Sequence, residues 1–182
     1  PDVKMNSNLI FAAYDKLVYD RNALYRSYWT VVSNPNWFQI SESYFKRGGV
    51  DESGIDYRWR YLMYLGAFRY PVSGKWYPHQ NKPVVRSQNV PIFPVMRATE
   101  MHYIMAEYYA RNGNFGKAYE VLNAIREDRG IRGSSLSGTT WAEFQADLLH
   151  EARREWLSEG QMFYLYKRLN ASLKIGDQVR PM

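Results

Sequence analysis

The sequence predicts a mainly α-helical fold whose amino-terminal half is an irregular, aromatic-rich loop region with a few short strands. Three observations support this: two apolar stripes at helical spacing between residues 96 and 130, a capping signal that begins a further helix near residue 140, and five prolines between residues 71 and 94. Proline lacks a backbone N–H and fixes φ, so the proline-rich stretch excludes any long regular element between residues 71 and 96. The clearest helices are therefore expected in the carboxy-terminal half.

The amino-terminal half carries weaker signals. Residues 6–28 have a helical stripe with Asn6 or Ser7 as its cap, which favours a helix, although the apolar run at 9–11 could equally begin a strand. Residues 29–54 contain turn-forming residues and no persistent stripe, which predicts a loop. Residues 56–70 alternate between two faces, and this favours a strand over a competing helix. Short edge strands are also allowed at 84–85 and at 90.

Residues 96–130 are expected to form two antiparallel helices. Each half has apolar residues at i, i+3, i+4 and i+7. The first stripe is Met101, Ile104, Met105 and Tyr108, and the second is Ala118, Val121, Leu122 and Ile125. Between them, Asn112-Gly113-Asn114 tolerates the left-handed conformation that ends a helix, and Gly130 offers a stop for the second helix.

A third helix is expected to begin at Thr140. Thr140 and Glu143 have the spacing of a capping box, in which each side chain satisfies a free backbone amide of the first turn. An apolar periodic run follows directly at Phe144, Leu148, Ala152 and Trp156.

A charged stripe runs along the same helix. It consists of Glu151, Glu155 and Glu159, with Arg153 and Arg154 between them. Such a stripe is most often a solvated helix face, and this is the interpretation we favour. The alternative is a buried, structural ion-pair network with Arg97 and Glu100.

Several short fragments occur in a fixed order along the chain. They are Arg97-Ala98-Thr99-Glu100, Ala106-Glu107, Asn112-Gly113-Asn114, Ala118, Leu122-Asn123, Ile125-Arg126, Gly130, Glu151, Glu155-Trp156, Glu159-Gly160, Phe163 and Arg168. Their order and spacing resemble the carboxy-terminal part of the SusD/RagB family. The resemblance is clear over residues 90–170 and fainter upstream. Met162 and Leu165 depart from it, because the family usually has an arginine and an aspartate there.

The resemblance implies tetratricopeptide-like helical hairpins. We expect an irregular, aromatic-rich segment with one or two helices over residues 1–95, the helical hairpin plus third helix over 96–170, and a tail over 171–182. Together they would be a fragment of one larger domain. The family further implies a surface-exposed lipoprotein of the Gram-negative outer membrane, which binds oligosaccharide and delivers it to a SusC-like TonB-dependent transporter for polysaccharide utilisation. Its contact with the membrane would be an amino-terminal lipid anchor that lies outside this chain.

Composition gives no sign of catalysis or of nucleic-acid binding. Hydrophobic residues at 46% and charged residues at 23% are ordinary for a globular protein, and the basic residues behind the net charge of +6 are scattered. With no cysteine, disulfides and cysteine-based sites are excluded. The histidines, His79, His102 and His150, have no partner at zinc-motif spacing. Glu151 and Glu155 lie beside arginines, which would keep both ionised, whereas a glycosidase needs an acid of raised pKa. We expect no enzyme activity, metal or cofactor.

The aromatic content indicates a binding surface. The chain has 16 tyrosines, 8 phenylalanines and 6 tryptophans, and rings beyond the needs of a core usually serve interfaces or ligand platforms. Sugars suit such platforms because one face of a sugar ring presents C–H groups and its rim presents hydroxyls. The predicted ligand-binding residues lie outside the helical stripes: Trp29, Trp37, Tyr44, Trp59, Trp76 and Tyr77. The plain alternative is that at least half of these rings pack under the loops.

Two other functions stay open. One is a tetratricopeptide-like scaffold for protein–protein interaction, which would show an apolar groove along its helices. The other is a carbohydrate-active enzyme, which would need two carboxyl groups about 5 to 10 Å apart in a cleft.

Overall fold

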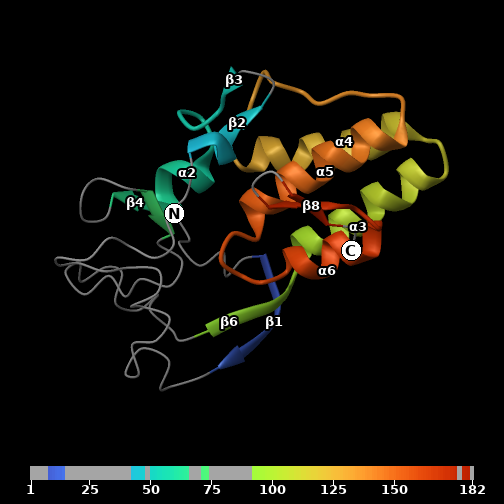
Figure 1. Ribbon diagram of the computed structural model, residues 1–182. Helices are drawn as coiled ribbons and strands as arrows, with labels where there is room; N and C mark the ends of the chain where they lie inside the picture. Colours follow the sequence, from blue (N-terminus) through green and yellow to red (C-terminus); the bar gives the residue numbers. More distant parts are fainter. Residues whose placement is uncertain are drawn as a thin grey trace.

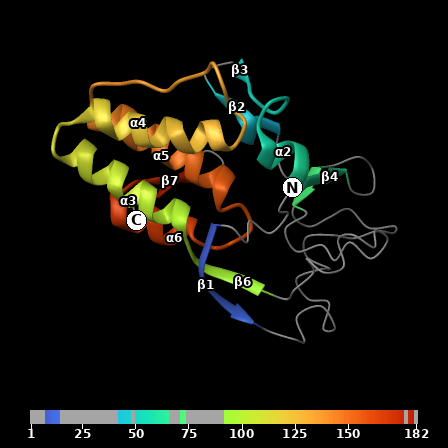
Figure 2. The same cartoon turned by 180° about the vertical axis from the view of Figure 1, so that it is seen from behind.

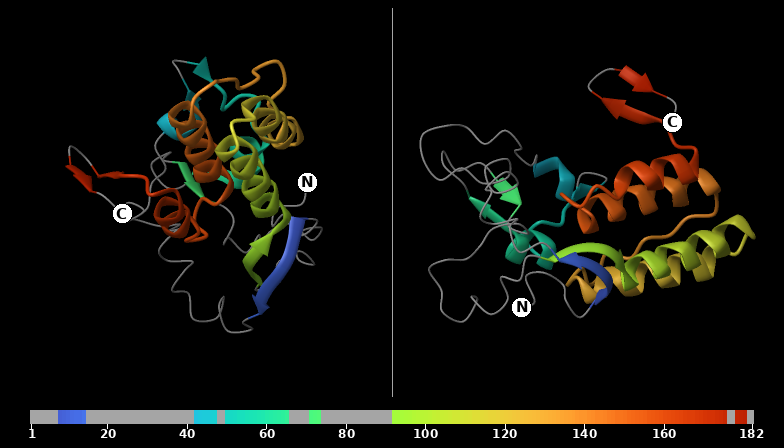
Figure 3. Two further views of the ribbon diagram at one scale, coloured as in Figure 1. Left: turned by 90° about the vertical axis from the view of Figure 1, so that its right-hand side faces the viewer. Right: turned by 90° about the horizontal axis from the view of Figure 1, so that it is seen from below.

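The computed structural model describes residues 8–14, 42–47, 50–65, 71–73, 92–175 and 178–180. These residues form five α-helices and several short strand pairs, so the mainly α prediction is confirmed. Helices α3 to α6 form a bundle, with the α3–α4 hairpin as one layer and α5–α6 as the other (Figure 3). None of the helices described here is long and apolar enough to span a bilayer.

The hairpin between α3 (Ala98–Arg111) and α4 (Phe115–Asp128) forms where the sequence predicts it. Gly113 ends α3 with a φ of +75°, a conformation that glycine adopts without steric cost. The Asn114 side chain then accepts a hydrogen bond from the Lys117 amide and caps α4. The predicted start at residue 96 is two residues early, because Met96 and Arg97 end strand β6 (Ile92–Arg97).

The carboxy-terminal helices are α5 (Trp141–Glu155) and α6 (Met162–Leu169). The predicted capping box is confirmed: Thr140 accepts from the Glu143 amide, and the Glu143 carboxylate accepts from the Thr140 amide at 3.0 Å. Asn170 ends α6 in the left-handed conformation. Strands β7 (Leu173–Ile175) and β8 (Gln178–Arg180) then pair as a hairpin (Figure 3).

Small and aromatic side chains fill the bundle interior. Alanines of α3 and α4 allow these helices to approach closely, while Tyr103 packs edge-on against Trp156 with ring centroids 5.3 Å apart. The predicted α4 stripe is confirmed, since three of its members are buried and Val121 is half-buried. The core residues of the four helices are Tyr103, Ala106, Ala110, Ala118, Tyr119, Leu122, Ile125, Phe144, Leu148, Ala152, Leu165, Tyr166 and Leu169.

The predicted α3 stripe faces outward instead of into the core. Met101, Ile104, Met105 and Tyr108 are between 39% and 63% exposed. The opposite face, with Tyr103, Ala106 and Ala110, is the buried one. Helix α3 is therefore apolar on two sides, and spacing alone does not say which side packs. Close contact with α4 and α5 selects the side with the smaller residues.

Two amino-terminal predictions are wrong. Residues 9–14 form strand β1 (Leu9–Tyr14), which pairs antiparallel with β6, so the helix favoured for 6–28 does not hold there (Figure 1). Residues 57–62 form helix α2 (Tyr57–Leu62) instead of a strand, because the Asp56 side chain caps it by accepting from the Arg58 amide. Only the continuation of that segment, β4 (Met63–Leu65), is a strand, and it pairs with β5 (Pro71–Ser73).

The segment predicted as loop contains short elements. They are the 3-10 turn η2 (Glu42–Phe45) and the strands β2 (Lys46–Arg47) and β3 (Val50–Asp51), which form a small hairpin. With α2 they gather at one end of the bundle (Figure 1, Figure 2). The edge strands allowed at 84–85 and 90 lie outside the described residues.

The outward-facing stripe of α3 gives a stability prediction when it is compared with a buried residue elsewhere. Ile104 is 42% exposed on the outer face, whereas Ile131, after α4, is 2% exposed. Ile131→Ala should lower the free energy of unfolding by about 2–5 kcal/mol, because it leaves a cavity. Ile104→Ala should change it by less than about 1 kcal/mol. Urea denaturation of both variants measures this, and a comparable loss at Ile104 would contradict the exposed placement of the stripe.

Candidate functional site

A cluster of buried charges lies where α3, α4 and α5 meet the amino-terminal segment. It is balanced: five arginines face five acids among the described residues, so no charge in the cluster lacks a partner of opposite sign. We call these residues the ion cluster. They are Arg58, Arg97, Arg126, Arg129 and Arg154, with Glu52, Asp56, Glu151, Glu155 and Glu159.

Two residues of the α5 stripe form the centre of the ion cluster. Glu151 accepts from Arg58 at 2.9 Å and from Arg126. Glu155 accepts from Arg129 through both oxygens, Oε1 at 2.8 Å and Oε2 at 3.0 Å. Its Oε2 also lies 3.5 Å from Arg58. The solvated-face interpretation is therefore wrong, and the buried network is the correct alternative.

The network differs in membership from the one considered on sequence. Arg97 belongs to it, through Glu155 at 3.3 Å and Glu159 at 3.2 Å. Glu100 is half-buried on α3, and among the described residues no hydrogen bond or ion pair joins it to the cluster. Acids about 100 residues from α5 in sequence take its place in the network. The helical pattern of α5 does not show which distant residues pack against it.

Residues 52–58 are attached to the bundle through this cluster. Glu52 accepts from Arg126 at 2.7 Å and from Arg154, and the Tyr57 amide donates to the carbonyl of Arg129 at 2.8 Å. Gly130 is required at this junction. Its φ is +87°, and a Cβ there would lie 2.5 Å from the Tyr57 ring.

The arginines keep the central carboxylates ionised. Burial alone would raise the pKa of Glu52, but hydrogen bonds and charges from Arg126 and Arg154 outweigh it and lower that pKa to about 2. Burial likewise opposes ionisation of Glu155, yet Arg129, Arg97 and Arg58 hold the pKa of Glu155 well below its ordinary value. Neither group can serve as a proton donor at neutral pH.

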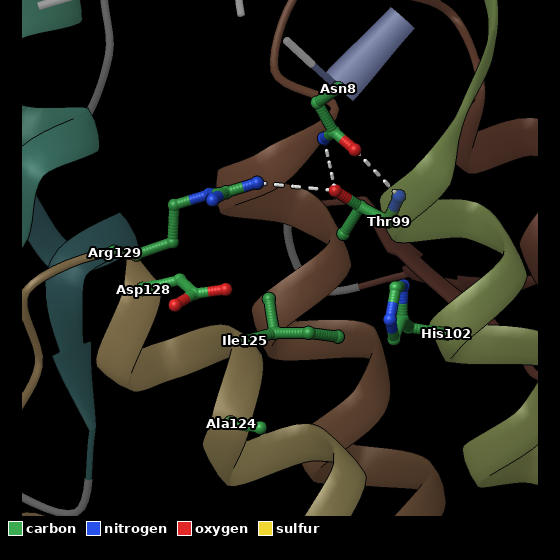
Figure 4. Close-up of a pocket in the computed structure, with 7 residues that line it drawn as sticks. All are labelled: Asn8, Thr99, His102, Ala124, Ile125, Asp128 and Arg129. Atoms are coloured by element: carbon green, nitrogen blue, oxygen red, sulfur yellow. Dashed lines mark hydrogen bonds between the residues drawn. The ribbon is translucent and has the colours of Figure 1, made fainter. Parts of the chain in front are cut away.

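A polar pocket opens beside the ion cluster, between the start of α3 and the end of α4. Its volume is about 250 Å³, and Figure 4 shows its side chains converging on one space. The lining residues are Asn8, Thr99, His102, Ile125, Asp128 and Arg129, with Ala124 at the lower edge.

The wall of the pocket is held by Glu155 of the ion cluster. The Thr99 hydroxyl donates to Glu155 at 3.1 Å and accepts from Arg129 at 3.1 Å. Asn8 accepts from the Thr99 amide at 3.0 Å, and its own amide donates to the Thr99 hydroxyl. These bonds fix three lining side chains before any ligand arrives.

Two lining groups, His102 and Asp128, offer hydrogen-bond acceptors to a ligand. The Nδ1 of His102 lies 2.8 Å from the Ala98 carbonyl, which can only accept, so Nδ1 carries the hydrogen and Nε2 of the neutral ring is an acceptor. The exposed Asp128 carboxylate makes no hydrogen bond or ion pair with the described residues. The pocket therefore offers acceptors beside the apolar side chain of Ile125.

The aromatic residues predicted to bind ligand are placed only in part. Trp29, Trp37, Trp76 and Tyr77 lie outside the described residues. Tyr44 and Trp59 are half-buried, and Trp59 packs edge-on against Phe45 with centroids 5.0 Å apart. Neither lines the pocket, so the assignment of the six rings to a ligand stays a prediction.

Sequence reasoning missed the pocket residues. Asn8 reaches Thr99 across 91 positions, and Asp128 and His102 lie on different helices, so no local motif marks them. Within the described residues, no three histidine, aspartate or glutamate side chains gather as a metal site would require.

The fold and this pocket define a helical module with a preformed polar pocket. The SusD family matches residues 13–182, so the chain belongs to the SusD family. It is also similar to the crystal structure of a protein from Bacteroides vulgatus ATCC 8482 that is described, provisionally, as sugar binding. That similarity has a TM-score of 0.52 and 25% sequence identity, and it covers 69% of this chain. This chain spans 26% of that protein's length. No curated protein matches the sequence.

The lowered pKa of Glu52 predicts a pH dependence of stability. Because the folded-state pKa of about 2 lies below the ordinary value of 4.5, the stabilising contribution is complete above pH 4.5 and is lost as pH falls towards 2. In Glu52→Gln, the free energy of unfolding should fall less steeply across this window and should start lower at pH 7.

Urea denaturation at steps between pH 7 and pH 2.5 measures both slopes. Glu120→Gln, which alters an exposed carboxylate of α4, is the matched control and should keep the wild-type slope. Equal slopes for Glu52→Gln and the wild type would show that Glu52 is not ion-paired in the folded protein.

Proposed function

We propose that this chain is part of a glycan-binding protein that captures oligosaccharide at the cell surface. The observation that supports this most directly is membership of the SusD family over residues 13–182. The similarity to a protein described provisionally as sugar binding points the same way. The polar pocket beside the ion cluster gives the chain a place where hydroxyl groups could be recognised.

The proposal extends to delivery and location. The bound oligosaccharide would pass to a SusC-like TonB-dependent transporter of the outer membrane, and a lipid anchor elsewhere in the protein would hold it at the surface. Residues 1–95, 96–170 and 171–182 would then be pieces of one larger domain. Family membership supports this part of the proposal.

The protein would act without catalysis. The two α5 glutamates considered as a glycosidase pair are fully buried and paired with arginines. A glycosidase instead needs one carboxyl group of raised pKa facing its substrate in a cleft. The direction of the pKa shift at Glu155 is the opposite.

A second function is favoured by one observation, the exposed apolar stripe of α3. Its four residues have the spacing by which one helix packs against another, so an amphipathic helix of a partner protein could lie along it. A scaffold role of this kind would use the outer face of α3. The pocket lies between α3 and α4, so the two functions can be tested separately.

Tryptophan-fluorescence titration with soluble plant, host and microbial oligosaccharides tests the glycan proposal. We expect a saturable response, weakened about tenfold in Trp37→Ala or Trp76→Ala, because a lost ring contact costs on the order of 1.4 kcal/mol. Tyr164→Ala removes an exposed ring of α6 and should leave the affinity unchanged. If folded wild-type protein responds to no glycan, the proposal is wrong, and a helical peptide becomes the ligand to test.

A further inference from the structure

The pocket beside the ion cluster has a definite polarity. Asp128 and His102 face its space from opposite sides, with Ile125 between them (Figure 4). The Asp128 carboxylate accepts hydrogen bonds, and so does the Nε2 of His102 when the ring is neutral, because the contact with the Ala98 carbonyl then places the hydrogen on Nδ1. A ligand that satisfies both must therefore present donors on two of its sides.

The charge of the pocket narrows the ligand further. The Arg129 guanidinium is engaged by both oxygens of Glu155, at 2.8 and 3.0 Å, so its positive charge is compensated within the ion cluster. Asp128 then contributes the one uncompensated charge among the described lining residues. An anionic group would be repelled, because like charges in a partly desolvated site destabilise each other.

From this geometry we propose that the pocket binds one neutral sugar ring through its hydroxyl groups and discriminates against acidic sugars. Two hydroxyls would donate to Asp128 and to His102 Nε2, and a C–H patch of the ring would lie on Ile125. This inference rests on the proposed glycan-binding function and assigns to it residues other than the six aromatic residues predicted from the sequence. The volume of about 250 Å³ lies below the ~300–1,000 Å³ of pockets for drug-sized ligands, which fits a single ring.

The ion cluster makes the site rigid. Thr99, Arg129 and Asn8 are held by mutual hydrogen bonds and by Glu155, so the pocket keeps its shape without a ligand. A preformed site loses little conformational entropy on binding. Specificity then depends on Asp128 and His102, whose acceptor atoms make no hydrogen bond with the described residues.

Binding of neutral and acidic saccharides to the full chain tests the proposal. The probes are glucose, galactose, mannose and xylose and their linear hexamers, with glucuronate and hexagalacturonate as the acidic members. Affinity is measured by calorimetry, and the position of binding is measured by NMR shifts of the Asp128 and His102 amides. We expect a neutral probe to shift both amides. Asp128→Asn should weaken that probe about tenfold, because a hydrogen bond to a charged carboxylate becomes a weaker bond to a neutral amide oxygen.

Glu127→Gln is the matched control, because it changes a neighbouring exposed carboxylate of α4 that does not line the pocket. It should bind as the wild type does. Asp128→Asn should also bind the acidic probes more tightly than the wild type does, a gain that simple loss of structure would not produce.

Each other outcome has a definite meaning. If a glycan binds but Asp128→Asn has the affinity of the wild type, the pocket assignment is wrong and the proposed function stands. If an acidic probe binds in the pocket more tightly than the neutral probes do, the assignment to neutral sugars is wrong. If no probe and no oligosaccharide binds to folded protein, both the assignment and the proposed function are wrong.

Discussion

The balanced ion cluster is the interaction on which the rest of this structure depends. Its ten charged side chains come from the segment around α2, from the end of β6 and from α4 and α5, so it joins parts of the chain up to about 100 residues apart. Removing either partner of a buried pair would leave a charge without compensation, which costs several kcal/mol. The cluster therefore fixes one arrangement of these elements more than it adds to stability.

The pocket depends on the same cluster. Glu155 holds Arg129 and Thr99, and Thr99 in turn holds Asn8 at the start of β1. The proposed binding site is thus built on structural charges, of which Glu155 is ionised and fully buried and Arg129 reaches the pocket wall. Few polar groups of the pocket remain for a ligand, and this suits selective binding better than catalysis. This division separates the buried carboxylates of α5, which hold the fold together, from the exposed carboxylate of Asp128, which is available to a ligand.

Local signals in the sequence predicted the local structure well. The Thr140–Glu143 capping box, the turn at Gly113 and the core stripe of α4 all depend on residues within a few positions of each other. Non-local structure was not accessible in this way. Strand β1 forms because β6 pairs with it, and the α5 glutamates are buried because Glu52 and Arg58 approach from afar. The pocket residues share this origin: the aromatic content and the family resemblance indicated a binding function, but neither indicated these residues.

The central claim is that the ion cluster makes the segment around α2 and the helical bundle one cooperative unit. Native-state hydrogen exchange tests it directly, because the Tyr57 amide donates to the Arg129 carbonyl and reports docking of the segment, while the Leu122 amide reports the bundle core. The account predicts equal opening free energies for the two amides, equal to the global free energy of unfolding. An opening free energy at Tyr57 that is several kcal/mol lower than at Leu122 would show that the segment detaches independently, and would contradict the account.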